Sequence, residues 1–135
     1  MAFTGNWKKS KTENGMAVLK HAGFPDEQLE QLAKATATIE IKQNGDHFLE
    51  KMTLGTIVSN TEMNVGKESV FNVLTGGTVK AVPTYDGENK ITAQYDHNGI
   101  HFSGYRQLLS PNEFVDYVDL DHGKVVGKFY YTKTE

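Results

Sequence analysis

The sequence predicts an all-β fold: a ten-stranded antiparallel up-and-down β-barrel with a short helix-turn-helix lid between its first and second strands. Three observations lead to this prediction. Apolar and polar residues alternate with period two over most of the chain, and tight-turn dipeptides separate the alternating segments. Only residues 14–34 carry apolar side chains at helical spacing. The length of 135 residues suits one domain, so residues 1–135 are expected to form a single barrel.

The first strand is predicted at residues 3–9, and a first short helix follows it. Met16, Leu19 and Ala22 recur at the spacing that places them on one side of this helix. Gly23 is placed to end it in a left-handed conformation.

A second short helix is predicted directly afterwards. Pro25 suits a first helical position, and Asp26 complements the positive end of the helix dipole. Leu29, Leu32 and Ala33 supply an apolar stripe. Helices of about two turns are stable only when they pack on something. The pair is therefore expected to cap one open end of the barrel.

The rest of the chain is predicted to form nine strands joined by turns such as Asn44-Gly45, Gly76-Gly77 and Asn98-Gly99. The strands are expected at residues 38–43, 47–53, 57–64, 69–74, 78–85, 90–96, 99–109, 113–120 and 124–132. A meander of this length tends to close so that no edge strand stays unpaired. An eight-stranded barrel is just wide enough to fill with side chains, so ten strands predict an internal cavity.

The composition excludes several classes of function. Because there is no cysteine, the chain has no disulfide, no thiolate metal cluster and no cysteine nucleophile. The net charge of −3 and the scattered basic residues argue against a nucleic-acid partner. No apolar run is long enough to cross a bilayer and no signal segment is recognisable, which favours a cytoplasmic protein. Catalytic motifs such as G-x-S-x-G and H-E-x-x-H are absent, so no enzyme activity, cofactor or metal site is expected.

Several short motifs, in order along the whole chain, resemble those of the intracellular lipid-binding proteins. The motifs are Phe3-Thr4-Gly5-Asn6-Trp7, the helical segment, Ile39 to Asp46, Val65-Gly66-Lys67-Glu68, Tyr85 to Lys90, and Lys128-Phe129-Tyr130. The start of the chain, the Gln43-Asn44-Gly45-Asp46 turn and the segment Val65 to Ser69 look most like the liver and ileal branch of that family.

The resemblance implies a carrier, with no catalytic role, that holds a hydrophobic small molecule inside the barrel and transports or buffers it in the cytosol. A long-chain fatty acid is the favoured ligand. A bile acid, sterol or retinoid is the alternative with the same fold. A monomer is expected, with transient membrane contact through lysines on the helices such as Lys20 and Lys34.

The resemblance also suggests where a ligand head group binds. Many members place a basic residue and a tyrosine two positions apart on the last strand, and here Lys128 and Tyr130 match that spacing, which puts both on one face of the strand. A lysine lacks the planar fork of arginine, so a looser head-group site is expected. The second polar partner is Gln107 or, if the register slips by one, its neighbour Arg106. A buried Arg106 would need an anionic ligand or a nearby carboxylate.

Alternation suggests a set of apolar residues for the cavity wall, and family position suggests the entrance. The wall candidates are Phe48, Met52, Met63, Phe71, Tyr95 and Phe102. The portal is expected at Leu29, Leu32, Ile57 and Val58, beside the helices. Trp7 matches an aromatic residue that closes the far end of the barrel in the family.

Overall fold

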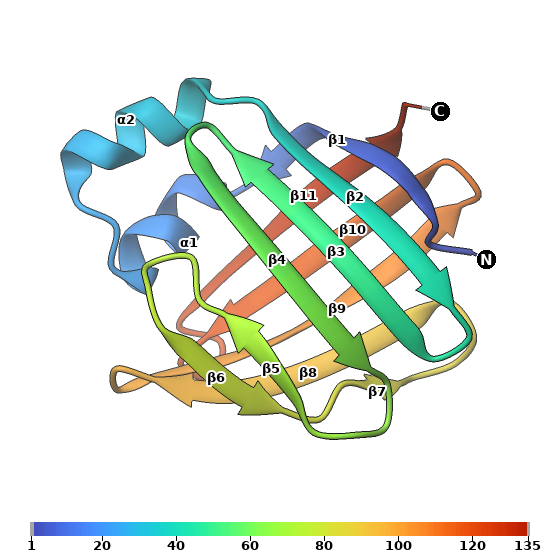
Figure 1. The fold of residues 1–135 in the computed structure, drawn as a ribbon. Coiled ribbons are helices and arrows are strands. Elements are labelled where there is room, and N and C mark those ends of the chain that lie inside the picture. The colour runs from blue at the N-terminus through green and yellow to red at the C-terminus, as the bar shows by residue number, and fades with distance from the viewer. Residues whose placement is uncertain (1, 135) are drawn as a thin grey trace.

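The computed structural model describes residues 2–134, which form one curled antiparallel sheet with two short helices at one end (Figure 1). The helices are α1 (Gly15–Ala22) and α2 (Asp26–Lys34). The strands are β1 (Gly5–Glu13), β2 (Ala37–Asn44), β3 (His47–Leu54), β4 (Ile57–Asn64), β5 (Ser69–Asn72), β6 (Thr78–Ala81), β7 (Thr84–Tyr85), β8 (Lys90–His97), β9 (Ile100–Ser110), β10 (Glu113–Leu120) and β11 (Val125–Lys133). The predicted all-β fold class is confirmed.

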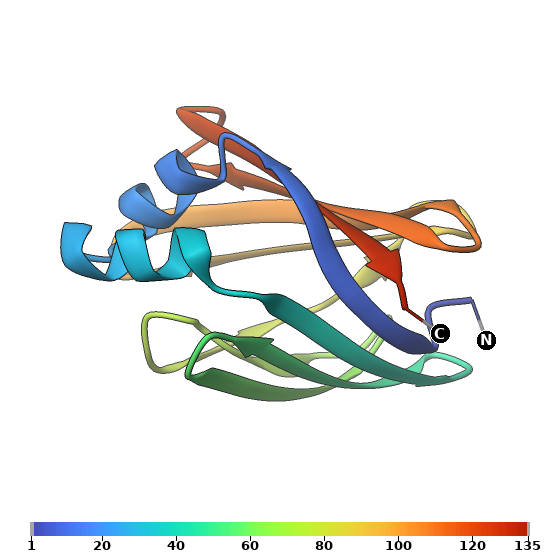
Figure 2. The ribbon, with the colours of Figure 1, turned by 90° about the horizontal axis from the view of Figure 1, so that it is seen from above.

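The sheet follows the order β6-β5-β4-β3-β2-β1-β11-β10-β9-β8-β7, so the first and last strands pair in its middle. Seen from above, the layer of β2 to β5 lies opposite the layer of β8 to β11, with the helices at one end (Figure 2). The sheet has eleven strands in place of the predicted ten because the expected strand 78–85 is divided. Pro83 stands at the division and has no N–H for a ladder bond. The two halves pair with different neighbours, β6 with β5 and β7 with β8.

The helical segment folds close to its predicted bounds. Gly23 ends α1 with a φ of 115°, and the backbone N–H groups of Gly23 and Phe24 donate to the carbonyls of Lys20 and Leu19. The second helix begins at Asp26, so Pro25, predicted at the first helical position, lies one position before the helix, where its carbonyl accepts the N–H of Leu29. The predicted end of the first helix and the predicted start of the second therefore agree with the structure to within one residue.

The apolar stripe of α1 differs from the prediction. Val18 is the buried apolar residue, Leu19 packs against the core, and Met16 is 41% exposed. Val18 rests directly on β11 at Gly127, where an added Cβ would lie 2.6 Å from the Val18 side chain. Glycine is required at this position because the helix and strand approach too closely for a side chain.

An aromatic cluster fills the end of the barrel away from the helices. Phe3, Phe48, Trp7 and Phe114 are almost fully buried, and the rings of Trp7 and Phe114 lie 4.7 Å apart. The indole N–H of Trp7 donates to the carbonyl of Phe3 at 3.0 Å. The predicted structural role of Trp7 in closing this end agrees with its packing.

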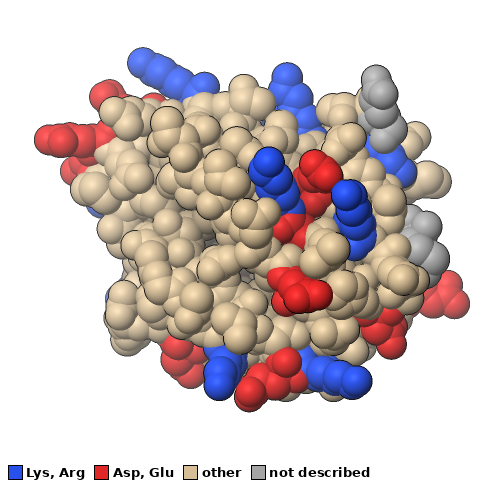
Figure 3. Space-filling model, viewed as in Figure 1, with Lys and Arg blue, Asp and Glu red and all other residues tan. Residues whose placement is uncertain are grey.

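Charged side chains of both signs are mixed on the face formed by β2 to β4 (Figure 3). Glu40 lies 3.8 Å from Lys42 on β2, and Lys51 and Glu62 are exposed on β3 and β4. Neither helix in the described part of the chain has the length and apolar character needed to cross a bilayer.

Candidate functional site

A cavity of about 220 Å³ lies between the helices and the barrel wall. The helical segment contributes Val18, Leu19, Ala22, Phe24 and Leu32 to its lining. The strands contribute mainly apolar residues, including Met52, Tyr95, Phe102 and Phe129. The side chains Lys9 and Asp116 also reach this lining. The helices therefore cover a cavity with an apolar wall and few polar groups.

A second cavity of about 270 Å³ adjoins the first, since Tyr95, Phe102, Asp116 and Val118 line both. Phe48, Met63, Phe71 and Ile91 give it an apolar wall, and Glu50, Arg106 and Asp116 give it a charged side. Pockets that hold small molecules are usually about 300 to 1,000 Å³. The two spaces together reach that range.

The register of the last strands places the predicted head-group residues Lys128 and Tyr130 on the outer face of the barrel. Paired residues on antiparallel strands share a face, and Lys128 pairs with Tyr117 while Tyr130 pairs with Val115. Lys11 stacks over the Tyr130 ring from the solvent side. The inward side chains of β11 are instead Phe129 and Tyr131. Lys128 and Tyr130 do share a face, as expected, but it is the outer one.

The same register turns Gln107 outward and Arg106 inward. Gln107 pairs with Lys90 and Val115 on the outer face, whereas Arg106 pairs with Asp116 and lines the second cavity. The favoured inward position of Gln107 is wrong, and the one-residue alternative with Arg106 inside is the observed one. A slip of one residue exchanges every side chain between the two faces. Phe102 lies four residues before Arg106 on β9 and therefore on the same inner face. Its ring stacks on that of Tyr95, with the ring centres 4.9 Å apart.

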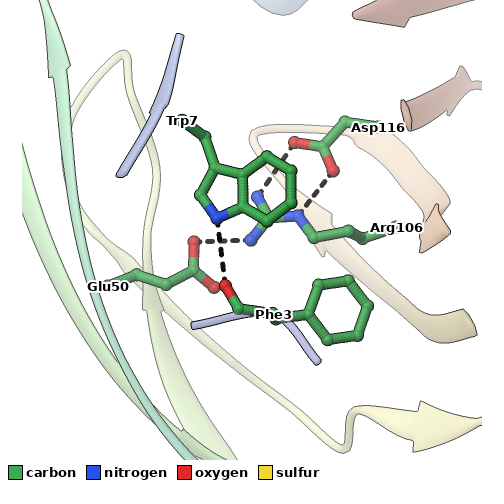
Figure 4. Close-up of polar contacts among 5 residues, drawn as sticks. All are labelled: Phe3, Trp7, Glu50, Arg106 and Asp116. Carbon is green, nitrogen blue, oxygen red and sulfur yellow. Dashed lines mark hydrogen bonds and ion pairs between the residues drawn. The ribbon is translucent and has the colours of Figure 1, made fainter. Parts of the chain in front are cut away.

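Two carboxylates hold Arg106 (Figure 4). Its Nε and one terminal nitrogen donate to the two oxygens of Asp116 at 2.7 and 2.9 Å, a bidentate pair. Its other terminal nitrogen lies 2.8 Å from Glu50 Oε1 on β3. The guanidinium carbon also lies 4.7 Å from the centre of the Phe114 ring. The nearby carboxylate that a buried arginine requires is therefore supplied by the protein itself.

We call Arg106, Asp116 and Glu50 the interior triad. Its side chains are only 17–20% exposed, and all three line the second cavity. Burial by itself lowers the pKa of Arg106, but Asp116 and then Glu50 outweigh it and raise that pKa well above its usual value. The guanidinium stays charged at every physiological pH. With two carboxylates against one guanidinium, the triad has a formal charge of minus one.

Two tyrosines in the cavity walls keep their protons. Burial raises the pKa of Tyr131, and the nearby Asp116 carboxylate raises it further. Burial alone raises the pKa of Tyr95. Both phenols are therefore neutral at pH 7 and able to donate a hydrogen bond.

The predicted portal residues separate into two groups. Leu32 lines the first cavity, and Leu29 and Ile57 pack in or against the core beneath the helices. Val58 is 55% exposed and pairs with Thr53 on the outer face of β3 and β4. Leu32 is thus placed at the cavity, whereas Val58 lines neither cavity because alternation turns its side chain outward.

Comparison with known proteins identifies the family. A family model described as the lipocalin and cytosolic fatty-acid binding protein family matches residues 1–104. The chain belongs to this family. The match ends within β9, so Glu50 falls inside it while Arg106 and Asp116 lie beyond it.

Relatives from this family support the resemblance seen in the sequence. The liver fatty acid-binding protein of Sus scrofa is 36% identical over 95 residues, which are 70% of this chain and 75% of that protein. The liver fatty acid binding protein 1-A of Danio rerio is 38% identical over 93 residues, which are 69% of this chain and 72% of that protein. The predicted family resemblance is confirmed.

Solved structures extend the likeness of fold to the whole chain. The Schistosoma mansoni fatty acid binding protein in complex with arachidonic acid aligns with a TM-score of 0.86, covering 99% of this chain and 97% of that chain. The two sequences are only 20% identical, so this likeness concerns the fold alone.

The charged residues Lys9, Glu50 and Asp116 and the buried Tyr131 line the cavities but are absent from the sequence prediction. Alternation contains the signal for two of them. Lys9 stands two residues after the buried Trp7, and Glu50 stands between the wall candidates Phe48 and Met52. Both were therefore readable as inward positions without any structure.

Proposed function

We propose that the protein is a carrier that binds a long-chain fatty acid in its internal cavity and moves or buffers it in the cytosol. The observation that carries this proposal is the space of about 220 Å³ beneath the helices together with the adjoining space of about 270 Å³ further inside the barrel. The fatty acid-binding proteins named above support the ligand class. The protein acts on its ligand by binding and release, with no chemical step, and works as a monomer.

The acyl chain supplies most of the binding energy in this proposal. Burial of one methylene group contributes about 0.8 kcal/mol. Met52, Phe102 and Phe129 offer apolar wall in the first cavity, and Phe71 continues it in the second. An unbranched chain of more than ten carbons thus has enough apolar surface to bind without any help from its head group.

In this proposal the ligand enters and leaves the cavity at the helical end of the barrel. Leu19 and Leu32 cover the first cavity from the helix side, and Leu74 and Thr75 reach it from the turn between β5 and β6. These are short elements at the edge of the fold, which open at lower free-energy cost than the paired strands. Opening at this end exposes the cavity and leaves the sheet intact.

A cavity-filling substitution tests the proposal. Met52→Trp places a large ring in the wall of the first cavity, and Lys51→Trp, one residue earlier on the exposed face, is the matched control. Calorimetric titration of delipidated protein with oleate is expected to show saturable binding by the wild type and by Lys51→Trp. Met52→Trp is expected to bind at least tenfold more weakly. Absence of oleate binding by the wild type, or equal binding by all three proteins, overturns the proposal.

A further inference from the structure

We propose that Lys9, on β1, is the residue that binds the carboxylate of the ligand, in the cavity directly beneath the helices. The inference rests on the proposed function, because it assigns the head-group site of that same ligand. Three observations support it: the side chain of Lys9 faces inward, its ammonium group has no ion-pair partner in the described residues, and Arg106 is already paired with two carboxylates.

The fold directs Lys9 to the interior. Trp7, two residues earlier, is buried, and Lys9 pairs with the buried Tyr131 across the β1–β11 ladder. A register shift between Lys9 and Lys11 then leaves Ser10 unpaired and turns Lys11 outward onto Tyr130. Lys9 is accordingly half-buried and lines the first cavity, together with Leu19 and Leu32 of the helical segment.

Lys9 has no ion-pair partner among residues 2–134. Asp116 lines the same cavity, but both of its carboxylate oxygens accept hydrogen bonds from Arg106. An ammonium group in a mostly apolar space is poorly solvated unless an anion joins it. A ligand carboxylate supplies that anion in the cavity that Lys9 lines.

The guanidinium of Arg106, which also faces inward, is already paired with carboxylates of the protein. Asp116 holds two of its nitrogens and Glu50 the third. The interior triad carries an excess negative charge, which repels a carboxylate approaching Arg106. The two charged sites therefore favour one orientation: carboxylate at Lys9 below the helices, and acyl chain extending toward Phe71 and Ile91 in the adjoining cavity.

The test compares an acid with an alcohol of the same chain. Oleate and oleyl alcohol are titrated into delipidated wild type, Lys9→Met and the control Lys8→Met, whose side chain is exposed on the opposite face of β1. A charge-assisted hydrogen bond in a cavity predicts that Lys9→Met weakens oleate binding about 10-fold to 100-fold and alcohol binding less than threefold. Lys9→Arg is expected to restore most of the oleate affinity, and Lys8→Met is expected to match the wild type.

A second measurement needs no substitution at Lys9. On the wild-type protein, the ε-methylene NMR signal of Lys9 is expected to shift when oleate binds and to stay in place when oleyl alcohol binds. The carboxyl signal of carbon-13-labelled oleate is expected to shift in return. This measurement decides the question even when Lys9→Met fails to fold.

The outcomes separate the two proposals. If the wild type binds neither compound, the carrier function fails and this inference falls with it. If the wild type binds oleate while Lys9→Met loses nothing, or loses acid and alcohol equally, the carrier function stands and the role of Lys9 is overturned. An oleate-dependent shift of every lysine signal except that of Lys9 also overturns it.

Discussion

The two ends of the barrel are closed by different means. Phe3, Trp7, Phe48 and Phe114 close the end away from the helices by packing ring against ring, with centroid distances of 4.7 to 6.4 Å. At the other end, α1 and α2 cover a cavity of about 220 Å³ and touch it with small aliphatic side chains such as Val18 and Leu32. The aromatic end is thus filled by packed rings, whereas the helical end, although Leu29 and Leu32 are buried, covers unfilled space.

This difference predicts that the aromatic end contributes more to stability, whereas the helical end controls ligand exchange. Closely packed aromatic residues lose many contacts when one is truncated, while residues beside an existing cavity have fewer contacts to lose. A single-residue bulge on β1 falls between the two regions, just after Lys9. Substitutions at the two ends should therefore have different consequences, and four predictions follow this comparison from the largest effect to the smallest.

The largest effect is expected at the aromatic end. Phe114 is fully buried and contacts Phe3, Trp7 and Tyr131. Phe114→Ala is expected to lower the free energy of unfolding by about 3 to 5 kcal/mol, and Leu32→Ala at the helical end by about 2 kcal/mol. Urea denaturation measures both. Met16→Ala, at an exposed position of α1, is the control and should change stability by less than about 0.5 kcal/mol. A larger loss for Leu32→Ala than for Phe114→Ala would contradict the comparison.

The interior triad between the two ends is expected to give a similar or slightly smaller effect. Arg106→Met leaves Asp116 and Glu50 as uncompensated interior charges, which costs about 3 to 5 kcal/mol. Replacing all three residues together by apolar side chains of similar size should recover most of that loss, because no charge then remains buried. Denaturation of the single and triple variants measures this. A triple variant that is no more stable than Arg106→Met would show that the triad contributes more than mutual charge neutralisation.

Much of the fold was predictable because its signals are local. The helical segment was found from apolar spacing and from Gly23 as its end, and the turns were found from dipeptides such as Asn98-Gly99. These features depend on neighbouring residues only. Met16 was assigned wrongly because a helix of about two turns accommodates more than one apolar stripe, and only contact with β11 at Gly127 selects Val18.

The facing of the last strands was not predictable by counting along the chain. Counting back from Lys128 put Gln107 on the same face as Lys128, and the ladders agree, because Tyr117 pairs with Lys128 and with Tyr105, two residues from Gln107. The count gives only the relation between the two residues. The inward placement of Gln107 was wrong because Lys128 itself faces outward. The better guides were buried neighbours at alternate positions. Trp7 marks Lys9 as an inward residue, and Phe48 and Met52 mark Glu50 between them.

A contact between α1 and the β10–β11 turn is expected to hold the cover in place. His21 Nε2 lies 2.6 Å from Asp121 Oδ2, and this hydrogen bond, with a second one from the backbone N–H of His101, lowers the pKa of Asp121 below its usual value. Asp121→Asn is expected to speed hydrogen exchange of the α1 amides several-fold and to leave amides around Phe114 unchanged. Asp96→Asn, which removes another exposed carboxylate beside His101, is the control.

The pH dependence of this contact has a definite sign. Because the pKa of Asp121 is lowered in the folded protein, its contribution is complete at neutral pH and is lost as the pH falls from about 3.8 through the lowered value. Exchange of α1 in the wild type should therefore approach that of Asp121→Asn in this acidic range. Identical exchange of the two proteins at pH 7 would show that the contact does not restrain the helix.

The smallest effect is expected from charges on the outside of the cover. Lys20 and Lys34 are exposed on the helices, and the contact of Lys20 with Asp26, at 3.9 Å between exposed groups, restrains it little. Transfer of a fluorescent fatty acid from the protein to anionic vesicles should slow as salt is added, because salt screens attraction between lysine and the membrane surface. Lys34→Gln is expected to slow transfer at low salt about twofold to fivefold, whereas Lys80→Gln, on exposed β6, should leave it unchanged. If the two variants transfer fatty acid at the same rate, the helical end has no special part in membrane contact. The two ends would then differ only in how each is closed and in the cavity beneath the helices.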